Sequence, residues 1–193
     1  MRIQFILGVL VLGLGTWAHA EPSGENWTYY GGDFANTHYS TLDQINADNF
    51  QDVKVAWRWT SIETEISELN PRYSSSQFKP TPLVVDGVMY LPTSFCQIVA
   101  LNAGNGELIW KFDPKSYEAG RPANLGYQHR GLSYWKSGTE ERLFIAVHDR
   151  KLWALDPATG NPCADFGDGG VVNLENSLGR TINPRMNTQS TPV

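Results

Sequence analysis

The chain repeats a pattern of short apolar runs, each followed by a turn rich in Asn, Asp and Gly. Ile98–Leu101 is followed by Asn-Ala-Gly-Asn-Gly, and Leu152–Leu155 is followed by Asp-Pro-Ala-Thr-Gly. Ala100 and Ala154, at matching places in the two copies, are 54 residues apart. This is the length of one four-stranded sheet with its loops. Repeats of this kind are typical of propellers and solenoids, in which each unit buries its faces against its neighbours.

The first copy carries signals for four antiparallel strands. Residues 81–91 hold two apolar runs separated by Asp86-Gly87, and Asp and Gly tolerate the positive φ that a two-residue hairpin turn requires. Runs at 98–101 and 107–112 add two more strands. We therefore predict an all-β chain. The second copy repeats the scheme, with strands predicted at 131–135, 142–147 and 151–155.

The residues outside these two units give weaker signals. Residues 53–60 alternate apolar and polar side chains, which predicts a half-buried strand. One helical turn is expected at 41–45, and a loop is expected at 61–76. A long polar insertion at 114–128 separates the two units, and loops of that length are usually functional or mobile.

Residues 1–20 have the features of a secretory signal peptide. A basic start precedes an apolar run at 3–14, and the small residues Ala18 and Ala20 provide a cleavage pattern. Because the run is shorter than a bilayer span, we expect export, cleavage after Ala20 and a periplasmic location. An uncleaved N-terminal anchor is the alternative. Residues 21–193 are then the N-terminal part of a propeller domain.

Charge and cysteine content exclude two classes of protein. The 15 basic and 20 acidic residues are not clustered, which argues against a nucleic-acid partner. No Cys-x-x-Cys-His motif is present, so covalently attached haem is excluded. Cys96 and Cys163 are the only cysteines. In an exported protein they could form a disulfide, and the alternative is two buried thiols.

Residues 191–193 resemble the start of the strand at Thr81–Leu83 and suggest that a third unit begins here. Two units cannot close a ring, since propellers generally have four to eight blades, and an open sheet edge promotes aggregation. We therefore expect this chain to be the N-terminal piece of a longer protein. A short protein that completes its fold by oligomerising is the alternative.

Five stretches, in the same order, resemble the N-terminal third of pyrroloquinoline-quinone (PQQ)-dependent dehydrogenases, the quinoprotein alcohol and glucose dehydrogenase family. The resemblance implies an eight-bladed β-propeller with PQQ in the axial channel beside a calcium ion. This chain would supply roughly two blades and a lead-in segment. The matching stretches are Trp27–Asp33, Asp43–Ile45 with Val53–Trp57, Thr81–Leu83, Arg130–Trp135 and Cys163–Gly167.

The resemblance assigns three candidate cofactor-binding residues. Arg130 matches the arginine of the family's Arg-Gly-Leu-x-Tyr-Trp motif, which contacts the quinone, and its planar fork can bind a carboxylate bidentately. A surface arginine paired with an acid is the alternative. Lys79 stands where relatives carry Glu or Gln facing the cofactor, or is a solvated lysine at a strand end. His129 is a further cofactor candidate or a hydrogen-bonded structural histidine.

The catalytic residues are not assigned. In the family mechanism, which the resemblance implies, an Asp takes the hydroxyl proton while hydride passes to the quinone and calcium polarises its carbonyl. That Asp and the calcium ligands are expected beyond residue 193, and we name no metal ligand here. We interpret Asp149, Asp156 and Asp165 as structural because they lie in turns, where Asp bonds to its own backbone.

The resemblance implies a periplasmic oxidoreductase that passes electrons from a sugar, polyol or other alcohol to a respiratory-chain acceptor, a quinone or a cytochrome. Residues 126–129 lack the adjacent cysteines of the methanol dehydrogenase branch, which favours the glucose-dehydrogenase-like branch. A non-catalytic propeller that acts as a binding scaffold is one alternative. An inactive truncated fragment is the other.

Overall fold

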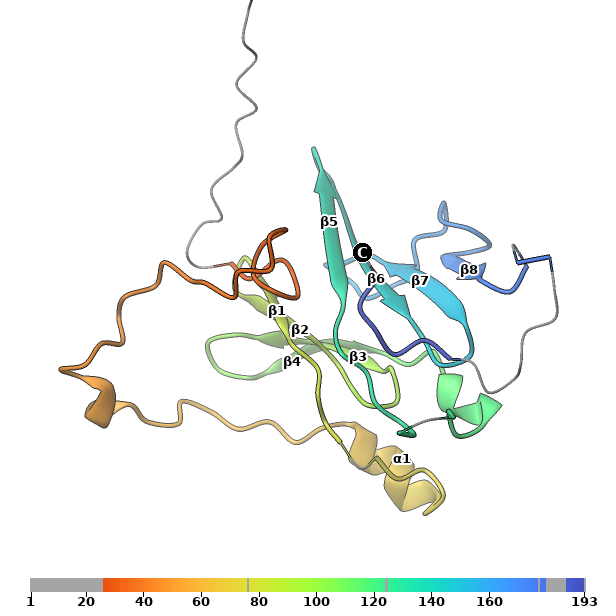
Figure 1. Ribbon diagram of the computed structural model, residues 1–193, viewed down its shortest axis with the longest axis horizontal. Coiled ribbons are helices and arrows are strands. Elements are labelled where there is room, and N and C mark those ends of the chain that lie inside the picture. Colours follow the sequence, from red (N-terminus) through yellow and green to blue (C-terminus); the bar gives the residue numbers. More distant parts are fainter. Residues whose placement is uncertain (1–25, 76, 124, 177, 180–186, 193) are drawn as a thin grey trace, which may run out of the picture.

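The computed structural model describes residues 26–192, except residues 76, 124, 177 and 180–186. In this part of the chain, two four-stranded antiparallel sheets lie against each other (Figure 1). The predicted signal peptide at 1–20 and the last residue of the predicted third unit lie outside the described residues. The lead-in runs away from the sheets and returns to them through a short helix (Figure 1).

The first sheet is the complete unit that the sequence predicts. Its strands follow chain order, and the β1–β2 hairpin turns at Asp86 and Gly87, with φ values of 48° and 80°. These positive φ angles confirm the predicted hairpin chemistry. The strands are β1 (Leu83–Val85), β2 (Val88–Pro92), β3 (Ile98–Asn102) and β4 (Leu108–Phe112).

The second sheet repeats this order, and its fourth strand is interrupted. After β7, Leu155 forms an isolated bridge with Pro162, and the chain then makes an excursion before it pairs with β7 again as β8. The sequence does not predict β8, a strand of only three residues. The strands are β5 (Ser133–Ser137), β6 (Glu140–Ala146), β7 (Lys151–Leu155) and β8 (Val171–Asn173). Between the sheets, the insertion contains a 3-10 turn, η2 (Ser116–Ala119).

The main core lies between the two sheets. Leu83 and Ile98 from the first sheet and Leu143 and Ile145 from the second are 0% exposed and belong to one cluster. Successive side chains of a strand point to opposite faces, so each sheet directs one set of alternating residues into this shared layer. The two sheets therefore pack face to face as neighbouring blades.

A helix that the sequence analysis missed precedes the first sheet. Residues 61–76 were predicted as a loop, which is wrong, because they contain α1 (Glu63–Leu69). Ile62 and Ile66, four positions apart, are both buried, and Ile62 packs with the outer face of the first sheet. Two apolar positions give too weak a period to identify a helix in advance. No helix in the described part of the chain is both long enough and apolar enough to cross a membrane.

Two other predictions for the lead-in are wrong in detail. Residues 53–60 are extended but form no strand ladder with any described residue. The alternation survives only at one end of this segment, where Trp57 and Trp59 pack against the first sheet and Arg58 between them is exposed, whereas Val53 and Val55 are both exposed. No helical turn forms at 41–45, and the nearest is the 3-10 turn η1 (Phe50–Asp52).

A tryptophan–glycine contact occurs twice, one unit apart. The ring of Trp57 covers Gly106, and its indole N–H donates to the carbonyl of Ala103 at 3.0 Å. The ring of Trp110 covers Gly160 in the same way. Both glycines have positive φ, and a Cβ at either would lie 2.5 Å from the ring. Trp57 of the lead-in thus covers a turn of the first unit, and Trp110 of the first unit covers a turn of the second, where only glycine fits.

Both cysteines are free in this structure. Cys96 is fully buried, and burial raises the pKa of its thiol to about 12. Cys163 is only partly buried, and desolvation raises its thiol pKa as well. Of the two alternatives, free thiols therefore match the structure and the disulfide does not.

Candidate functional site

The segments that enter β1 and β5 run side by side with residues 189–192. The amide of Thr81 donates to the carbonyl of Arg130 at 2.8 Å, and Thr81 and Gly131 form a parallel bridge. The amide of Arg130 donates to the carbonyl of Gln189 at 3.1 Å. We call these four residues the crossing. Both backbone polar groups of Arg130 are therefore held by the neighbouring segments.

Gly131 allows the segments to approach this closely. A Cβ at this position would lie 3.1 Å from the Thr191 hydroxyl, 3.2 Å from the Tyr30 ring and 3.4 Å from the Thr81 carbonyl. The first two distances are tighter than ordinary contacts, so a side chain here would push the crossing apart. Close packing of the crossing therefore explains why a glycine follows Arg130 in this structure.

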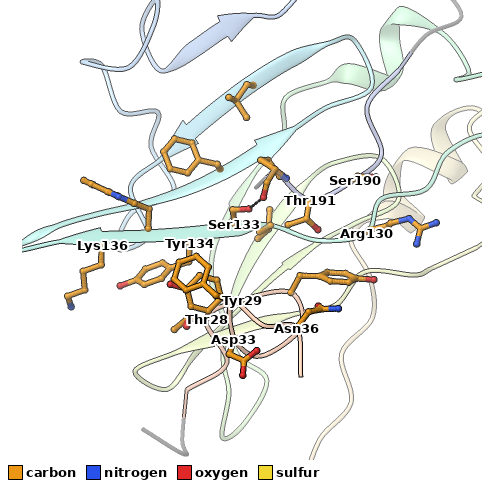
Figure 2. Close-up of a pocket in the computed structure, with 18 residues that line it drawn as sticks. Thr28, Tyr29, Asp33, Asn36, Arg130, Ser133, Tyr134, Lys136, Ser190 and Thr191 are labelled. Atoms are coloured by element: carbon orange, nitrogen blue, oxygen red, sulfur yellow. Dashed lines mark hydrogen bonds between the residues drawn. The ribbon is translucent and has the colours of Figure 1, made fainter. Parts of the chain in front are cut away.

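Arg130 lies at the edge of an open cavity of about 1140 Å³. Aromatic side chains, including Tyr29 of the lead-in and Tyr134 of β5, line much of this cavity, and Arg130 extends away from them (Figure 2). The Arg130 side chain is exposed. Within the described residues, no carboxylate forms an ion pair with it. Its positive charge is therefore available to an anionic ligand.

His129 is buried beneath the crossing, with an exposed fraction of 0%. Its Nε2 lies 2.9 Å from the carbonyl oxygen of Ala146, and its Nδ1 accepts the amide of Gly131 at 3.3 Å. Burial lowers the pKa of His129 to about 4 and the nearby His148 lowers it too, against the opposing effect of the hydrogen bond to Ala146. These contacts favour the structural alternative, and a cofactor contact of His129 stays a prediction.

Two further side chains, those of His148 and Gln189, form hydrogen bonds around the crossing, and neither is a site candidate from the sequence. His148 is 4% exposed, its Nε2 lies 2.9 Å from the Gln128 carbonyl, and burial lowers its pKa. The side chain of Gln128 donates to Gln189 Oε1, and Gln189 Nε2 donates to the carbonyl of Gly126, both at 2.9 Å. A signal for Gln189 exists in the sequence, since it precedes Thr191 by the spacing that places Lys79 before Thr81.

Lys79 is exposed and lies on the segment that enters the crossing at Thr81. The structure thus places Arg130 in the crossing, His129 directly before it and Lys79 two residues from Thr81. Their contacts with a cofactor stay predictions.

The three aspartates interpreted as structural have protein partners. Asp149 pairs with Lys151 at 2.6 Å, and Asp156 accepts the amide of Ala158 at 2.7 Å in its own turn. Asp165, in the excursion between β7 and β8, pairs with Arg142 of β6. Among residues 26–192, apart from the gaps already stated, no group of three His, Cys, Asp or Glu residues is arranged to hold a metal ion.

Comparison with known proteins agrees with this architecture. The family model for the β-propeller domain of PQQ glucose/ethanol/alcohol dehydrogenases matches residues 27–193. The dehydrogenase subunit of the quinone alcohol dehydrogenase of Acetobacter aceti is 34% identical over 148 residues, 74% of this chain and 17% of that protein. Quinoprotein glucose dehydrogenase A of Acinetobacter calcoaceticus is 30% identical over 171 residues, 78% of this chain and 20% of that protein.

A solved structure gives the same result. The crystal structure of the quinohemoprotein alcohol dehydrogenase from Comamonas testosteroni superposes with a TM-score of 0.57 at 30% identity, and the match covers 79% of this chain and 20% of that one. The chain therefore spans about a fifth of the length of the relatives it matches. These matches confirm the resemblance and the predicted all-β propeller fold: the chain belongs to the PQQ-dependent glucose/ethanol/alcohol dehydrogenase family and forms part of its β-propeller domain.

Proposed function

We propose that this chain contributes the Arg130 crossing to a PQQ-dependent dehydrogenase that oxidises the hydroxyl group of a sugar, polyol or other alcohol. The observation that carries the proposal is Arg130 itself, an exposed cation without an ion-pair partner in the described chain, held by its backbone where successive units meet. Relatives named as alcohol and glucose dehydrogenases support this class of substrate.

Two cations, Arg130 in the crossing and Lys79 beside it, fit the chemistry of PQQ. The cofactor carries three carboxylates, and a guanidinium binds a carboxylate through two parallel hydrogen bonds that lysine cannot reproduce. Arg130 would hold one carboxylate in this way, and Lys79 would add a second positive charge. Bound PQQ supplies the redox chemistry by accepting hydride from the alcohol carbon, and the protein orients the two reactants.

The remaining parts of the reaction are proposals about the complete protein. We expect the complete protein to bind a calcium ion, with the calcium ligands and the general base provided by residues beyond 193. We expect the electrons to pass to a respiratory-chain quinone or cytochrome. Within the family, we favour a substrate of the glucose dehydrogenase type. Dye reduction by the PQQ- and calcium-loaded protein, assayed with a panel of sugars, polyols and simple alcohols, tests the substrate. Activity on simple alcohols alone would contradict the glucose-like assignment.

We also propose that the protein is exported to the periplasm after cleavage behind Ala20. The basic start, the short apolar run and the small residues at 18 and 20 support this. N-terminal sequencing of the protein from a periplasmic fraction should begin at Glu21. A mature protein that still begins at Met1 would contradict cleavage.

The test of the cofactor site is Arg130→Ala in the complete open reading frame. Loss of a charge-assisted pair should weaken PQQ binding by about 10- to 100-fold, as measured by equilibrium dialysis. Arg58→Ala, which removes an exposed arginine outside the crossing, is the matched control and should leave the affinity unchanged. Unchanged affinity in Arg130→Ala would remove Arg130 from the site. A folded wild type that binds no PQQ would instead favour the scaffold alternative.

A further inference from the structure

Two buried histidines link the backbone just before Arg130 to the end of β6 through a reciprocal pair of hydrogen bonds. His129, just before Arg130, reaches the carbonyl of Ala146 at the end of β6. His148, just after β6, reaches back to the carbonyl of Gln128. Both Nε2–oxygen distances are 2.9 Å. Residues 128–131 and 146–148 are therefore linked in both directions.

The hydrogen-bond partners decide which nitrogen of each ring carries the proton. Nδ1 of His129 accepts the Gly131 amide, so Nε2 holds the proton and donates to Ala146. Nε2 of His148 faces a carbonyl oxygen and must likewise be the donor. Both side chains are almost completely buried, and the N–H of each already donates to a backbone carbonyl. Neither N–H is therefore available to a ligand.

These hydrogen bonds fix the backbone around Arg130. Its own amide and carbonyl are bound to Gln189 and Thr81. The histidines fix the flanking carbonyl of Gln128 and amide of Gly131. Four consecutive residues are thereby held at the end of a long irregular insertion, and the direction in which the Arg130 side chain leaves the backbone is set before any ligand arrives.

We propose that His129 and His148 are positioning residues that hold Arg130 ready for a carboxylate of PQQ, an inference that rests on the proposed function. Ordering a flexible segment on binding costs free energy, and a segment that is already ordered avoids that cost. The pair therefore raises cofactor affinity through Arg130 and without touching the cofactor.

A matched pair of variants tests this role in the complete protein. His148→Gln keeps an N–H donor near the position of Nε2, whereas His148→Asn carries the same amide one methylene too short to reach the Gln128 carbonyl. We expect about tenfold weaker PQQ binding in His148→Asn and near-wild-type binding in His148→Gln, measured by equilibrium dialysis. Without PQQ, hydrogen exchange at the Arg130 and Gly131 amides should accelerate in His148→Asn only.

Trp110→Phe is the control for general destabilisation. It removes another 2.9 Å side-chain hydrogen bond between the two sheets, from Trp110 Nε1 to the carbonyl of Pro157, which lies outside the crossing. This variant should lower the melting temperature and leave PQQ affinity unchanged. If Trp110→Phe weakens PQQ binding as much as His148→Asn does, the positioning role is overturned.

A double-mutant cycle with Arg130→Ala separates this inference from the proposed function. If the histidine acts through Arg130, His148→Asn should cause no further loss of PQQ affinity once Arg130 is alanine. Additive losses would overturn the positioning role and leave the PQQ site intact. Absence of PQQ binding in the folded wild type would overturn the proposed function, and the inference with it.

Discussion

At the scale of single residues, the buried histidines are the polar groups on which the crossing depends. His129 has partners for both ring nitrogens only while the ring is neutral, because a proton on Nδ1 would face the Gly131 amide. Burial lowers its pKa to about 4, and His148 is the other titratable group that acts on it. The pKa of His148 is lowered by burial as well. The hydrogen bonds around the crossing therefore require neutral histidines, so we expect them to weaken when the histidines are protonated at low pH.

The first prediction concerns acid stability. The unfolded chain binds a proton at His129 near pH 6.5 and the folded chain only near pH 4, so this contribution to stability is complete above pH 6.5 and is lost as the pH falls towards 4. The loss amounts to about 3 kcal/mol. Denaturant unfolding of the complete protein at pH 7 and pH 4.5 should show a smaller pH effect in His129→Gln than in the wild type. His38→Asn, at an exposed histidine, should behave like the wild type. Equal pH effects in His129→Gln and the wild type would contradict the assignment.

At the scale of elements, the recurring tryptophan–glycine contact connects the lead-in to the first unit and the first unit to the second. Trp110 follows Trp57 by 53 residues, and the covered glycines, Gly106 and Gly160, are 54 apart. The two contacts thus keep the period of the strands themselves. Because β4 carries Trp110 to the turn after β7, the contact also joins the two sheets.

The second prediction tests this contact with two glycines of positive φ. Gly160→Ala and Gly138→Ala both place a side chain in the left-handed region, which costs about 1–2 kcal/mol. Only the alanine at 160 would also meet a ring, at 2.5 Å from Trp110, whereas nothing lies within 4 Å at 138. Gly160→Ala should therefore lose about 1–3 kcal/mol more unfolding free energy than Gly138→Ala. Equal losses in the two variants would show that the contact does not constrain the turn.

At the scale of the whole molecule, the two sheets stabilise each other through one shared layer. Leu83 lies in this layer, and Leu101, equally buried, lies on the opposite face of the first sheet against the lead-in. In repeat architectures, each unit owes much of its stability to the interface with its neighbour. A cavity in the shared layer should therefore lower the stability of both sheets.

The third prediction compares the two faces by native-state hydrogen exchange. Leu83→Ala and Leu101→Ala each remove the same buried atoms and should each cost about 2–5 kcal/mol. Only Leu83→Ala should also lower the protection of β6 amides, since its cluster includes Leu143 and Ile145 of that strand. Equal protection of β6 in the two variants would contradict a shared core.

Much of the fold could be predicted because its signals are local. The hairpin at Asp86-Gly87 and the continuous apolar runs of β2 and β3 depend on residues next to one another in the chain. The helix α1 could not be predicted, because its buried face is recognisable only once its distant neighbours are known. Ile62 packs on the first sheet, and Ile66 packs with Phe95 and Tyr127. Likewise, residues 53–60 show the alternation of a strand, but only the tertiary structure reveals whether a pairing partner is present.

The same division holds for the candidate site. The sequence alone determined the repeat, the family resemblance and Arg130 as the leading candidate. These signals are turn residues, strand spacing and a short motif, and each depends only on residues that are close together in the chain. Only the tertiary structure decided that Gln128 meets Gln189, 61 residues away, and that His148 reaches back 20 residues to hold the backbone before Arg130. Such contacts are invisible in a linear pattern because the packing of the two sheets, and no local preference of the residues, brings them within hydrogen-bond distance.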